Sequence, residues 1–304
     1  MAWVFLTGEY AFKLKKPVKY PFLDFSTIEA RESACREELR LNRRLASGVY
    51  LDVLPLRQEP SGALAINGTG EVVDWLVKMR RLPKDRMLDA LIEYNAATPR
   101  HVSSISKLLS PFYQSAARTL LSPDEYLRLF IAEHSKNREV LFQVDHNLPR
   151  GELDVVFSAL ERMLSKHRSA LELRALQDRI VDGHGDLKPE HICLLDPPAI
   201  IDCLEFNARL RMVDPFDELC YLGIECERLG AAWIGKQLIE DLAAGLSDHP
   251  PTEVLAFYRV YRCSLRARLS VAHLLEPVMR TPEKWIPRAR QYLAIASAAA
   301  KDIV

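Results

Sequence analysis

The sequence predicts an α+β fold of two lobes, a small β-rich lobe over residues 1–82 and a larger helical lobe over residues 83–304. Three observations support this. Short, strand-like apolar runs dominate the first 82 residues, whereas apolar residues recur at helical spacing from about residue 84 onward. Residues 192–203 interrupt the helical pattern with two apolar runs, "ICLL" and "IIDCL", around a "DPPA" turn.

The first lobe begins with "WVFLTGEYAFKLKK", which predicts two short strands around a Thr7-Gly8 turn. The spacing over residues 26–46 predicts a helix with Ser26 or Thr27 as its N-cap and Gly48 just past its end. Residues 48–58 predict a strand. Residues 63–83 predict a hairpin with its turn at Asn67-Gly68, and Pro83 ends the block.

The second lobe is predicted to be mainly helical. Apolar residues recur with helical periodicity over residues 85–97, 101–117, 123–136 and 152–176. Everything after Asp214 also has a helical pattern. Asp214 and Pro215 suit the N-cap and first position of a helix, which places Asp217 in its first turn.

Composition and charge exclude several classes of protein. Forty-one basic residues balance forty-one acidic ones, so no global charge favours nucleic acid or an anionic membrane surface. No apolar run reaches the roughly 18 residues of a membrane helix, and the N-terminus lacks the basic region of a signal peptide. The six cysteines form no CxxC pair, which favours a reducing compartment. We therefore expect a cytoplasmic protein without nucleic-acid or membrane partners.

The segment "HGDLKPEHICLL" contains the densest cluster of chemically active side chains. Asp186 and Lys188 lie between His184 and His191, and Asp202 ends the following "IID". Taken singly, Asp186 could belong to a turn and Asp202 could cap a strand end. We interpret His184 as a buried histidine that orders the loop rather than as a base.

"HGDLKPEH" differs at two positions from the "HRDLKPEN" catalytic loop of protein kinases, and its "HGD" resembles the aminoglycoside phosphotransferase and choline kinase branch of that fold. Lys13 ends an "AFK" that resembles the Ala-x-Lys of the lysine strand. "IID" resembles the metal-binding segment of this branch, and "DPFDEL" its following helix start. The resemblance spans Lys13 to about residue 230 and implies a protein-kinase-like fold.

The resemblance implies an ATP-dependent phosphotransferase that moves the γ-phosphate to a hydroxyl of a small molecule. Asp186 would orient the acceptor, and Lys188 would reach the γ-phosphate. Lys13 would hold the α- and β-phosphates, with Glu38 as its carboxylate partner and Glu37 as the second choice. The remaining implied residues are the metal ligands Asp202 and His191, for Mg²⁺ or Mn²⁺, and the backbone of Met79, Arg80 and Arg81 at the adenine edge.

The chain is also similar to the phosphotransferase-like half of bacterial two-domain proteins whose second half is a P-loop ATPase. The sequence contains no GxxxxGK[ST] motif. We therefore expect such an ATPase, if one acts with this protein, on a separate chain.

His191 departs from the family pattern, which has asparagine at this position. An imidazole nitrogen suits Mn²⁺, Zn²⁺ or Fe²⁺ better than Mg²⁺. Three outcomes stay open: His191 ligates a metal with a preference shifted toward Mn²⁺, one metal site stays empty, or catalysis is weak. Only twelve residues precede Lys13, so we expect either that the chain starts later than its relatives or that the phosphate-covering hairpin is reduced. Thr7-Gly8-Glu9 is the available turn, and its alternative role is to join the lysine strand to its neighbour.

Two other functions compete with the kinase hypothesis. One is a pseudokinase-like module that binds nucleotide or regulates with little catalysis. The other is a metal-dependent phosphoesterase with His184, Asp186 and His191 as ligands, which leaves Lys13 without a role.

The charge of the substrate stays open in the sequence. A cationic acceptor would suit the acidic residues Glu205, Asp217, Glu218, Glu225 and Glu227. An anionic one would suit Arg259, Arg262 and Arg266, which share a helix face. Alternatively, these arginines pair with the acidic helix.

Overall fold

The computed structural model describes residues 2–20, 23–143, 146–275 and 281–303. The chain forms two compact units. The first comprises Met1–Ala97 and His184–Arg211, and the second comprises Thr98–Gly183 and Met212–Val304. The segment with the two aspartates therefore belongs to the same unit as the N-terminal strands. The lobe boundary at residues 82 and 83 stays a prediction. None of the described helices combines the length and hydropathy needed to cross a bilayer.

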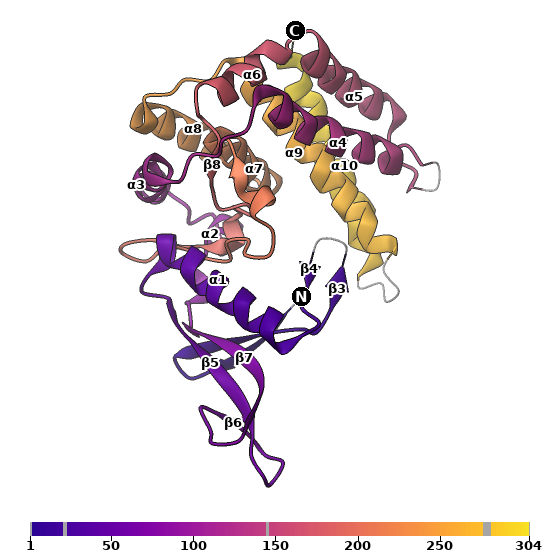
Figure 1. The fold of residues 1–304 in the computed structure, drawn as a ribbon. Helices are drawn as coiled ribbons and strands as arrows, with labels where there is room; N and C mark the ends of the chain where they lie inside the picture. The colour runs from indigo at the N-terminus through magenta and orange to yellow at the C-terminus, as the bar shows by residue number, and fades with distance from the viewer. Residues whose placement is uncertain (1, 21–22, 144–145, 276–280, 304) are drawn as a thin grey trace. The chain divides into compact units, whose positions relative to one another are not determined.

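The first unit contains a five-stranded antiparallel sheet in the order β1-β2-β7-β5-β6 (Figure 1). Its strands are β1 (Ala2–Thr7), β2 (Tyr10–Lys15), β5 (Tyr50–Gln58), β6 (Leu64–Ile66) and β7 (Glu71–Arg80). A small separate ladder joins β3 (Lys19–Tyr20) to β4 (Leu23–Asp24). The Thr7-Gly8-Glu9 turn connects β1 to β2, and Gly8 has a φ of +52° that favours glycine. This turn therefore joins the lysine strand to its neighbour.

The hairpin predicted with its turn at Asn67-Gly68 is wrong in its pairing. β6 pairs with β5, and β7 pairs with β5 and β2. The β5–β6 turn uses Gly62, whose φ is +83° and whose N–H donates to the carbonyl of Glu59 at 2.8 Å. The Glu59 carboxylate accepts from the Thr69 N–H at 2.8 Å and so holds the loop before β7. Turn residues lie at both ends of β6, and the structure uses the turn before it, so that β6 pairs with β5.

Helix α1 (Ile28–Ala46) packs against β5 and β7 (Figure 1). Thr27 is its N-cap, and its hydroxyl accepts from the Ala30 N–H at 3.1 Å, as one of the two predicted caps requires. The helix and sheet share a buried apolar cluster that includes Cys35, Tyr50 and Val77. This packing brings Glu38 of α1 to two lysines of β2.

The rest of the first unit carries the catalytic-loop motif. It contains η1 (Lys84–Arg86), α2 (Leu88–Glu93), η3 (Pro189–His191), β9 (Ile192–Cys193), β10 (Ala199–Ile200) and η4 (Ala208–Arg211). β9 and β10 form the predicted short antiparallel hairpin. The Asp196-Pro197 peptide bond in its turn is cis. β10 also contacts α1, which brings the residues after it to the same helix that packs on the sheet.

The second unit is mainly helical, as predicted. Its helices are α3 (Pro99–Ser115), α4 (Pro123–Leu141), α5 (Arg150–Ser165), α6 (Arg168–Leu176), α7 (Pro215–Arg228), α8 (Ala232–Leu246), α9 (Thr252–Ala272) and α10 (Trp285–Ala299), with the short turns η5 (His273–Leu275), η6 (Pro282–Lys284) and η7 (Ala300–Asp302). A two-residue ladder joins β8 (Val181–Asp182) to β11 (Met212–Val213). The segment 152–176 forms two helices instead of one, because the chain leaves the helix after Ser165.

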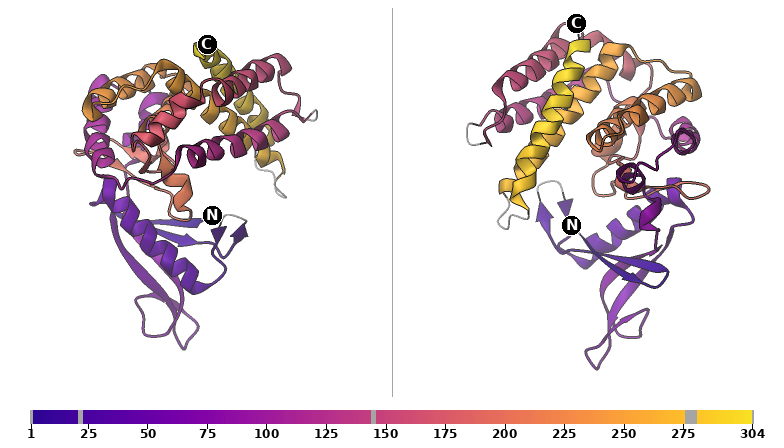
Figure 2. Two further views of the ribbon diagram at one scale, coloured as in Figure 1. Left: turned by 45° about the horizontal axis from the view of Figure 1, so that its top comes forward. Right: turned by 180° about the vertical axis from the view of Figure 1, so that it is seen from behind.

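The helices of this unit pack closely. α9 lies beside α10 and also contacts α7 and α4 (Figure 2). A Cβ on Gly235 would lie 2.7 Å from the Cα of Gly223, so the close approach of α7 and α8 requires glycine there. Asp214 caps α7 as predicted, with its carboxylate accepting from the Phe216 N–H at 2.9 Å. The α+β class predicted from the sequence is confirmed.

Candidate active site

Two lysines on β2 share one glutamate of α1. The ammonium of Lys13 lies 2.8 Å from Oε1 of Glu38, and that of Lys15 lies 2.7 Å from Oε2. Residues i and i+2 of a strand point to the same face, so both lysines reach the helix. Glu38 is completely buried, and the predicted pairing with Lys13 is confirmed. The second choice, Glu37, instead pairs with Arg40 at 2.7 Å.

Lys13 also contacts Asp202. Its ammonium lies 2.6 Å from Oδ1 of the aspartate, so the lysine bridges Glu38 and the second residue after β10. Asp202 has a φ of +63°, a left-handed conformation that few non-glycine residues adopt. Its N–H donates to the hydroxyl of Tyr50 at 3.2 Å, and the next N–H, of Cys203, donates to Asn42 at 2.9 Å. These contacts with the sheet and α1 hold Asp202 in its strained backbone.

The backbone of Asp186 is held on both sides by histidine rings. Its N–H donates to Nδ1 of His184 at 3.3 Å, and Nε2 of that ring lies 2.9 Å from the carbonyl of Ile201. On the other side, Nδ1 of His191 lies 2.9 Å from the Asp186 carbonyl. A carbonyl only accepts, so these distances assign the proton to Nε2 of His184 and to Nδ1 of His191.

His184 therefore orders the loop, as predicted. Burial lowers its pKa to about 3, so the ring is neutral at ordinary pH. Both of its nitrogens are engaged by backbone groups, which leaves no lone pair for a metal. This contradicts the phosphoesterase ligand set of His184, Asp186 and His191.

The carboxylate of Asp186 pairs with Lys188. The ammonium of Lys188 lies 2.9 Å from Oδ2 of Asp186 and 3.5 Å from Glu190. Burial raises the pKa of Asp186, but the charge and hydrogen bond of Lys188, together with the neighbouring histidines, outweigh burial and leave this pKa lowered. Burial likewise raises the pKa of Asp202, and the charge and hydrogen bond of Lys13, together with the same histidines, leave that pKa lowered as well. Both aspartates are therefore ionised at neutral pH.

One nitrogen and one oxygen are arranged so that they could bind a metal. Nε2 of His191 lies 3.5 Å from Oδ2 of Asp202, and the Asp202 side chain is 43% exposed. In the neutral ring with its proton on Nδ1, Nε2 offers a lone pair. Within the described ranges, no group of three or more His, Cys, Asp or Glu residues could hold a metal ion. Two protein ligands suit a cation that completes its shell with water and phosphate oxygens.

Two backbone N–H groups of the segment expected at the adenine edge already donate hydrogen bonds within the protein. The N–H of Arg80 donates to the carbonyl of Val49 at 2.9 Å, and that of Arg81 donates to Glu9 at 2.8 Å. Met79 is buried within β7, opposite Ala11 and Tyr50. Any hydrogen bond from this segment to a nucleotide base would have to use groups other than these two N–H groups.

The arginines of α9 pair with the acidic helix, which was the alternative to substrate binding. Arg262 forms a bidentate pair with Asp217 at 2.7 and 2.6 Å. Arg259 lies 2.7 Å from Glu227, and Arg266 lies 2.7 Å from Glu225. These pairs neutralise most of the charges that suggested a cationic or an anionic substrate. Of the other acidic candidates, Glu218 accepts from the Tyr113 hydroxyl and Glu205 pairs with Lys15.

Sequence reasoning missed three residues of this site, namely Lys15, Asn42 and Tyr50, and it considered Glu205 only as a partner for a cationic acceptor. Lys15 shares the strand face of Lys13. Its ammonium contacts Glu205, three residues after Asp202. The strand period was the one available signal for Lys15, whereas no local pattern marks Asn42, Tyr50 or Glu205.

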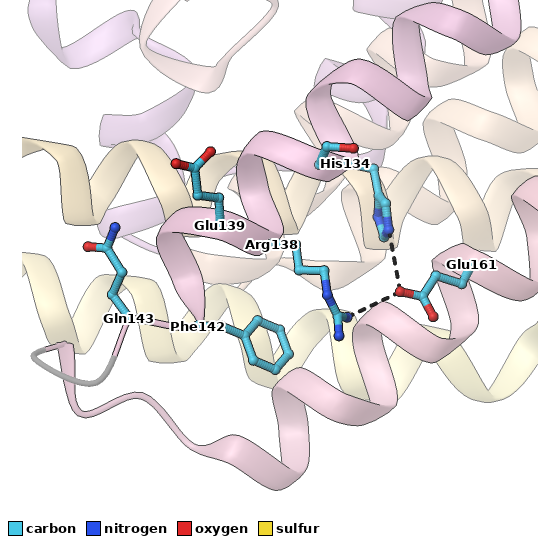
Figure 3. A pocket seen from close by; sticks show the side chains of 7 residues that line it. His134, Arg138, Glu139, Phe142, Gln143 and Glu161 are labelled. Carbon is cyan, nitrogen blue, oxygen red and sulfur yellow. Dashed lines mark hydrogen bonds and ion pairs between the residues drawn. The ribbon is translucent and has the colours of Figure 1, made fainter.

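The second unit has an open surface pocket of about 630 Å³ between α4 and α5 (Figure 3). Glu161 accepts there from Arg138 at 3.1 Å, and Nε2 of His134 lies 3.7 Å from the same oxygen. The remaining lining residues are Ser135, Glu139, Phe142 and Gln143. None of the predicted site residues lines this pocket.

The two-unit fold described above is the fold of small-molecule phosphotransferases. It superimposes on a choline/ethanolamine kinase family protein from Mesorhizobium loti with a TM-score of 0.54 at 19% identity, covering 99% of this chain and 89% of that one. It superimposes on a thermostable mutant of an aminoglycoside phosphotransferase with a TM-score of 0.55 at 11% identity, covering 99% and 90%. The resemblance seen in the sequence is confirmed at the level of the fold.

Curated relatives extend the comparison. The chain is 33% identical over 273 residues to an uncharacterized protein of Mycobacterium tuberculosis and equally to one of Mycobacterium bovis. The match covers 88% of this chain and 53% of each relative, so the chain spans about half of their length. No protein-family model matches the sequence.

Proposed function

We propose that the protein is an ATP-dependent phosphotransferase that moves the γ-phosphate to a hydroxyl of a small molecule. One observation carries the proposal: Lys13 bridges Glu38 and Asp202, at 2.8 and 2.6 Å. A lysine placed by a buried carboxylate beside an exposed one is suited to hold phosphates next to a cation site. A superimposed aminoglycoside phosphotransferase, with a TM-score of 0.52 at 11% identity, is described in complex with AMP-PNP and hygromycin B, which supports the nucleotide.

Asp202 and His191 would hold the metal. Their donor set, one carboxylate oxygen and one imidazole nitrogen, fits Mn²⁺ at least as well as Mg²⁺. When bound, the cation neutralises charge on the phosphates. The Lys13 ammonium adds a second positive charge from β2, and Glu38 keeps that ammonium directed at the site.

Asp186 would orient the acceptor. Its ionised carboxylate accepts a hydrogen bond from the acceptor hydroxyl, whose oxygen then bonds to the γ-phosphorus. The bond from the γ-phosphorus to the oxygen shared with the β-phosphate breaks, and the hydroxyl proton passes to Asp186. Lys188, at 2.9 Å from this carboxylate, keeps it ionised and supplies charge for the transferred phosphoryl group.

The acceptor is proposed only as a small molecule with a hydroxyl group. The paired charges of α7 and α9 provide no evidence for a cationic or an anionic acceptor. A P-loop ATPase partner on a separate chain and a cytoplasmic location stay predictions from the sequence.

Nucleotide binding and turnover test the proposal. ATP with Mn²⁺ or Mg²⁺ should raise the melting temperature, and Lys13→Met should weaken nucleotide binding by about tenfold, the effect of roughly one lost charged hydrogen bond. Lys16→Met is the matched control, because Lys16 lies just past β2 and stacks on Trp3. Wild-type protein that binds no ATP with either metal, or equal weakening in both variants, would contradict the proposal.

A further inference from the structure

Lys15 is a second buried lysine that the proposed reaction does not use. Its side chain is 2% exposed, and its ammonium lies 2.7 Å from Oε2 of Glu38. The same ammonium contacts the carboxylate of Glu205 and lies 5.0 Å from the ring centre of Phe25. A buried ammonium is costly unless it is paired and hydrogen-bonded. This enclosure, with two carboxylates and an aromatic ring, satisfies that need.

Lys13 and Lys15 together fix two points of one segment. Lys13 contacts Asp202, and Lys15 contacts Glu205 three residues later. Both lysines project from one face of β2, and Glu38 joins them through its two oxygens. Hydrogen bonds to Tyr50 and Asn42 hold the backbone of this segment, and the two lysines hold its side chains from β2. The contact of Lys15 with Glu205 adds an anchor beyond Cys203 and so further restricts how the Asp202 side chain is presented.

Lys15 also changes the net charge of the groups around Lys13. Lys13 and Lys15 face the three carboxylates of Glu38, Asp202 and Glu205. Without Lys15, the described contacts would leave Lys13 to offset all three negative charges. With Lys15 present, the excess of negative charge around Lys13 is smaller, which favours binding of a phosphate there, and Oδ2 of Asp202 lies near His191.

We propose that Lys15 and Glu205 are positioning residues for the nucleotide and metal site. Their buried ion pair anchors the Asp202 segment to β2, and Lys15 offsets part of the negative charge around Lys13, so that Lys13 and Asp202 serve the phosphates and the cation. This role rests on the proposed function. It assigns the two residues no contact with substrate.

The decisive variant is Glu205→Gln, which removes one charge and leaves Lys15 and Glu38 in place. Lys15→Met is the second variant and tests the same pair from the strand. Asp74→Asn is the matched control, because Arg31 and Asp74 form another largely buried pair between α1 and the sheet, at 2.8 Å. That control should cost comparable stability without touching the lysine network.

The first measurement needs no nucleotide. Amide hydrogen exchange over residues 201–205 should accelerate by about tenfold in Glu205→Gln, the effect expected for a lost charged hydrogen bond. The exchange rates of the same amides should change much less in Asp74→Asn, compared at an equal decrease in melting temperature. Equal acceleration in both variants would overturn the proposal, since the pair would then be merely structural.

The second measurement concerns the metal. The Mn²⁺ concentration that half-saturates binding of a non-hydrolysable ATP analogue should rise by roughly tenfold in Glu205→Gln and Lys15→Met, as for lost outer-shell partners. It should stay within about twofold in Asp74→Asn. An unchanged Mn²⁺ requirement in folded variants would also overturn the proposal. If wild-type protein binds no nucleotide, the proposed function is wrong, and hydrogen exchange still decides whether the pair positions the segment.

Discussion

Nδ1 of His191 lies 2.9 Å from the backbone oxygen of Asp186. The ring therefore donates one hydrogen bond to the loop that contains Asp186 and turns its other nitrogen toward Asp202, at 3.5 Å. An asparagine would offer an N–H donor and an oxygen lone pair. His191 can thus replace asparagine in bracing the loop, and the replacement changes the chemistry of the group at the proposed metal site.

Replacing His191 with asparagine should change metal preference. His191→Asn offers an amide oxygen where the wild-type protein offers a nitrogen, so the ratio of activity with Mn²⁺ to activity with Mg²⁺ should fall by roughly tenfold. Steady-state turnover across a titration of each metal measures it. His249→Asn, at an exposed position, is the control. Identical metal responses of wild type and His191→Asn would show that His191 is not a ligand.

Removing the charge of Asp186 should abolish most of the turnover. Asp186→Asn can no longer accept the acceptor proton, and a positioned base contributes roughly 100-fold or more to rate. ATP binding, followed by calorimetry, should change little because Asp186 contacts the acceptor. Asp178→Asn, an exposed aspartate with a φ of +54° that asparagine tolerates, serves as control. Full turnover in Asp186→Asn would rule out this assignment.

Stability should fall in acid partly because of His184. Its folded pKa is about 3, whereas the ordinary value is 6.5, so only the unfolded state takes up this proton between those values. The stabilisation is present above about pH 6.5 and is lost as pH falls toward 3. His184→Gln should therefore make the dependence of the unfolding free energy less steep by about 1.4 kcal/mol per pH unit. Urea unfolding at pH 6, 5 and 4 measures the slopes, and parallel slopes would contradict the prediction.

The arginine pairs of α9 should differ in their effect on stability. Arg262→Met leaves the buried carboxylate of Asp217 unpaired and should cost about 3 kcal/mol or more. Arg259 and Glu227 are more exposed, so Arg259→Met should cost less than about 1 kcal/mol. Denaturant unfolding of the two variants provides the comparison. Equal costs would mean that burial does not control the strength of these pairs.

Much of the fold and part of the site followed from the sequence. Each of the two motifs, "HGDLKPEH" and "IID", is an unbroken run of residues and can be recognised directly in the sequence. Helix and strand periods are also local, so α1, the β9–β10 hairpin and the cap at Asp214 could be predicted. The pairing of β6 with β5 could not, because turn residues flank β6 on both sides.

The sequence by itself determined which residues share a strand or helix face. Its motifs, through their resemblance to a kinase family, made Lys13, Glu38, Asp186 and Asp202 candidates. Only the tertiary structure decided which charges meet. Lys15 and Glu205 are 190 positions apart, and the arginines of α9 pair with carboxylates on another helix. Periodicity within one element orients a side chain, but its partner on a different element depends on how the elements pack.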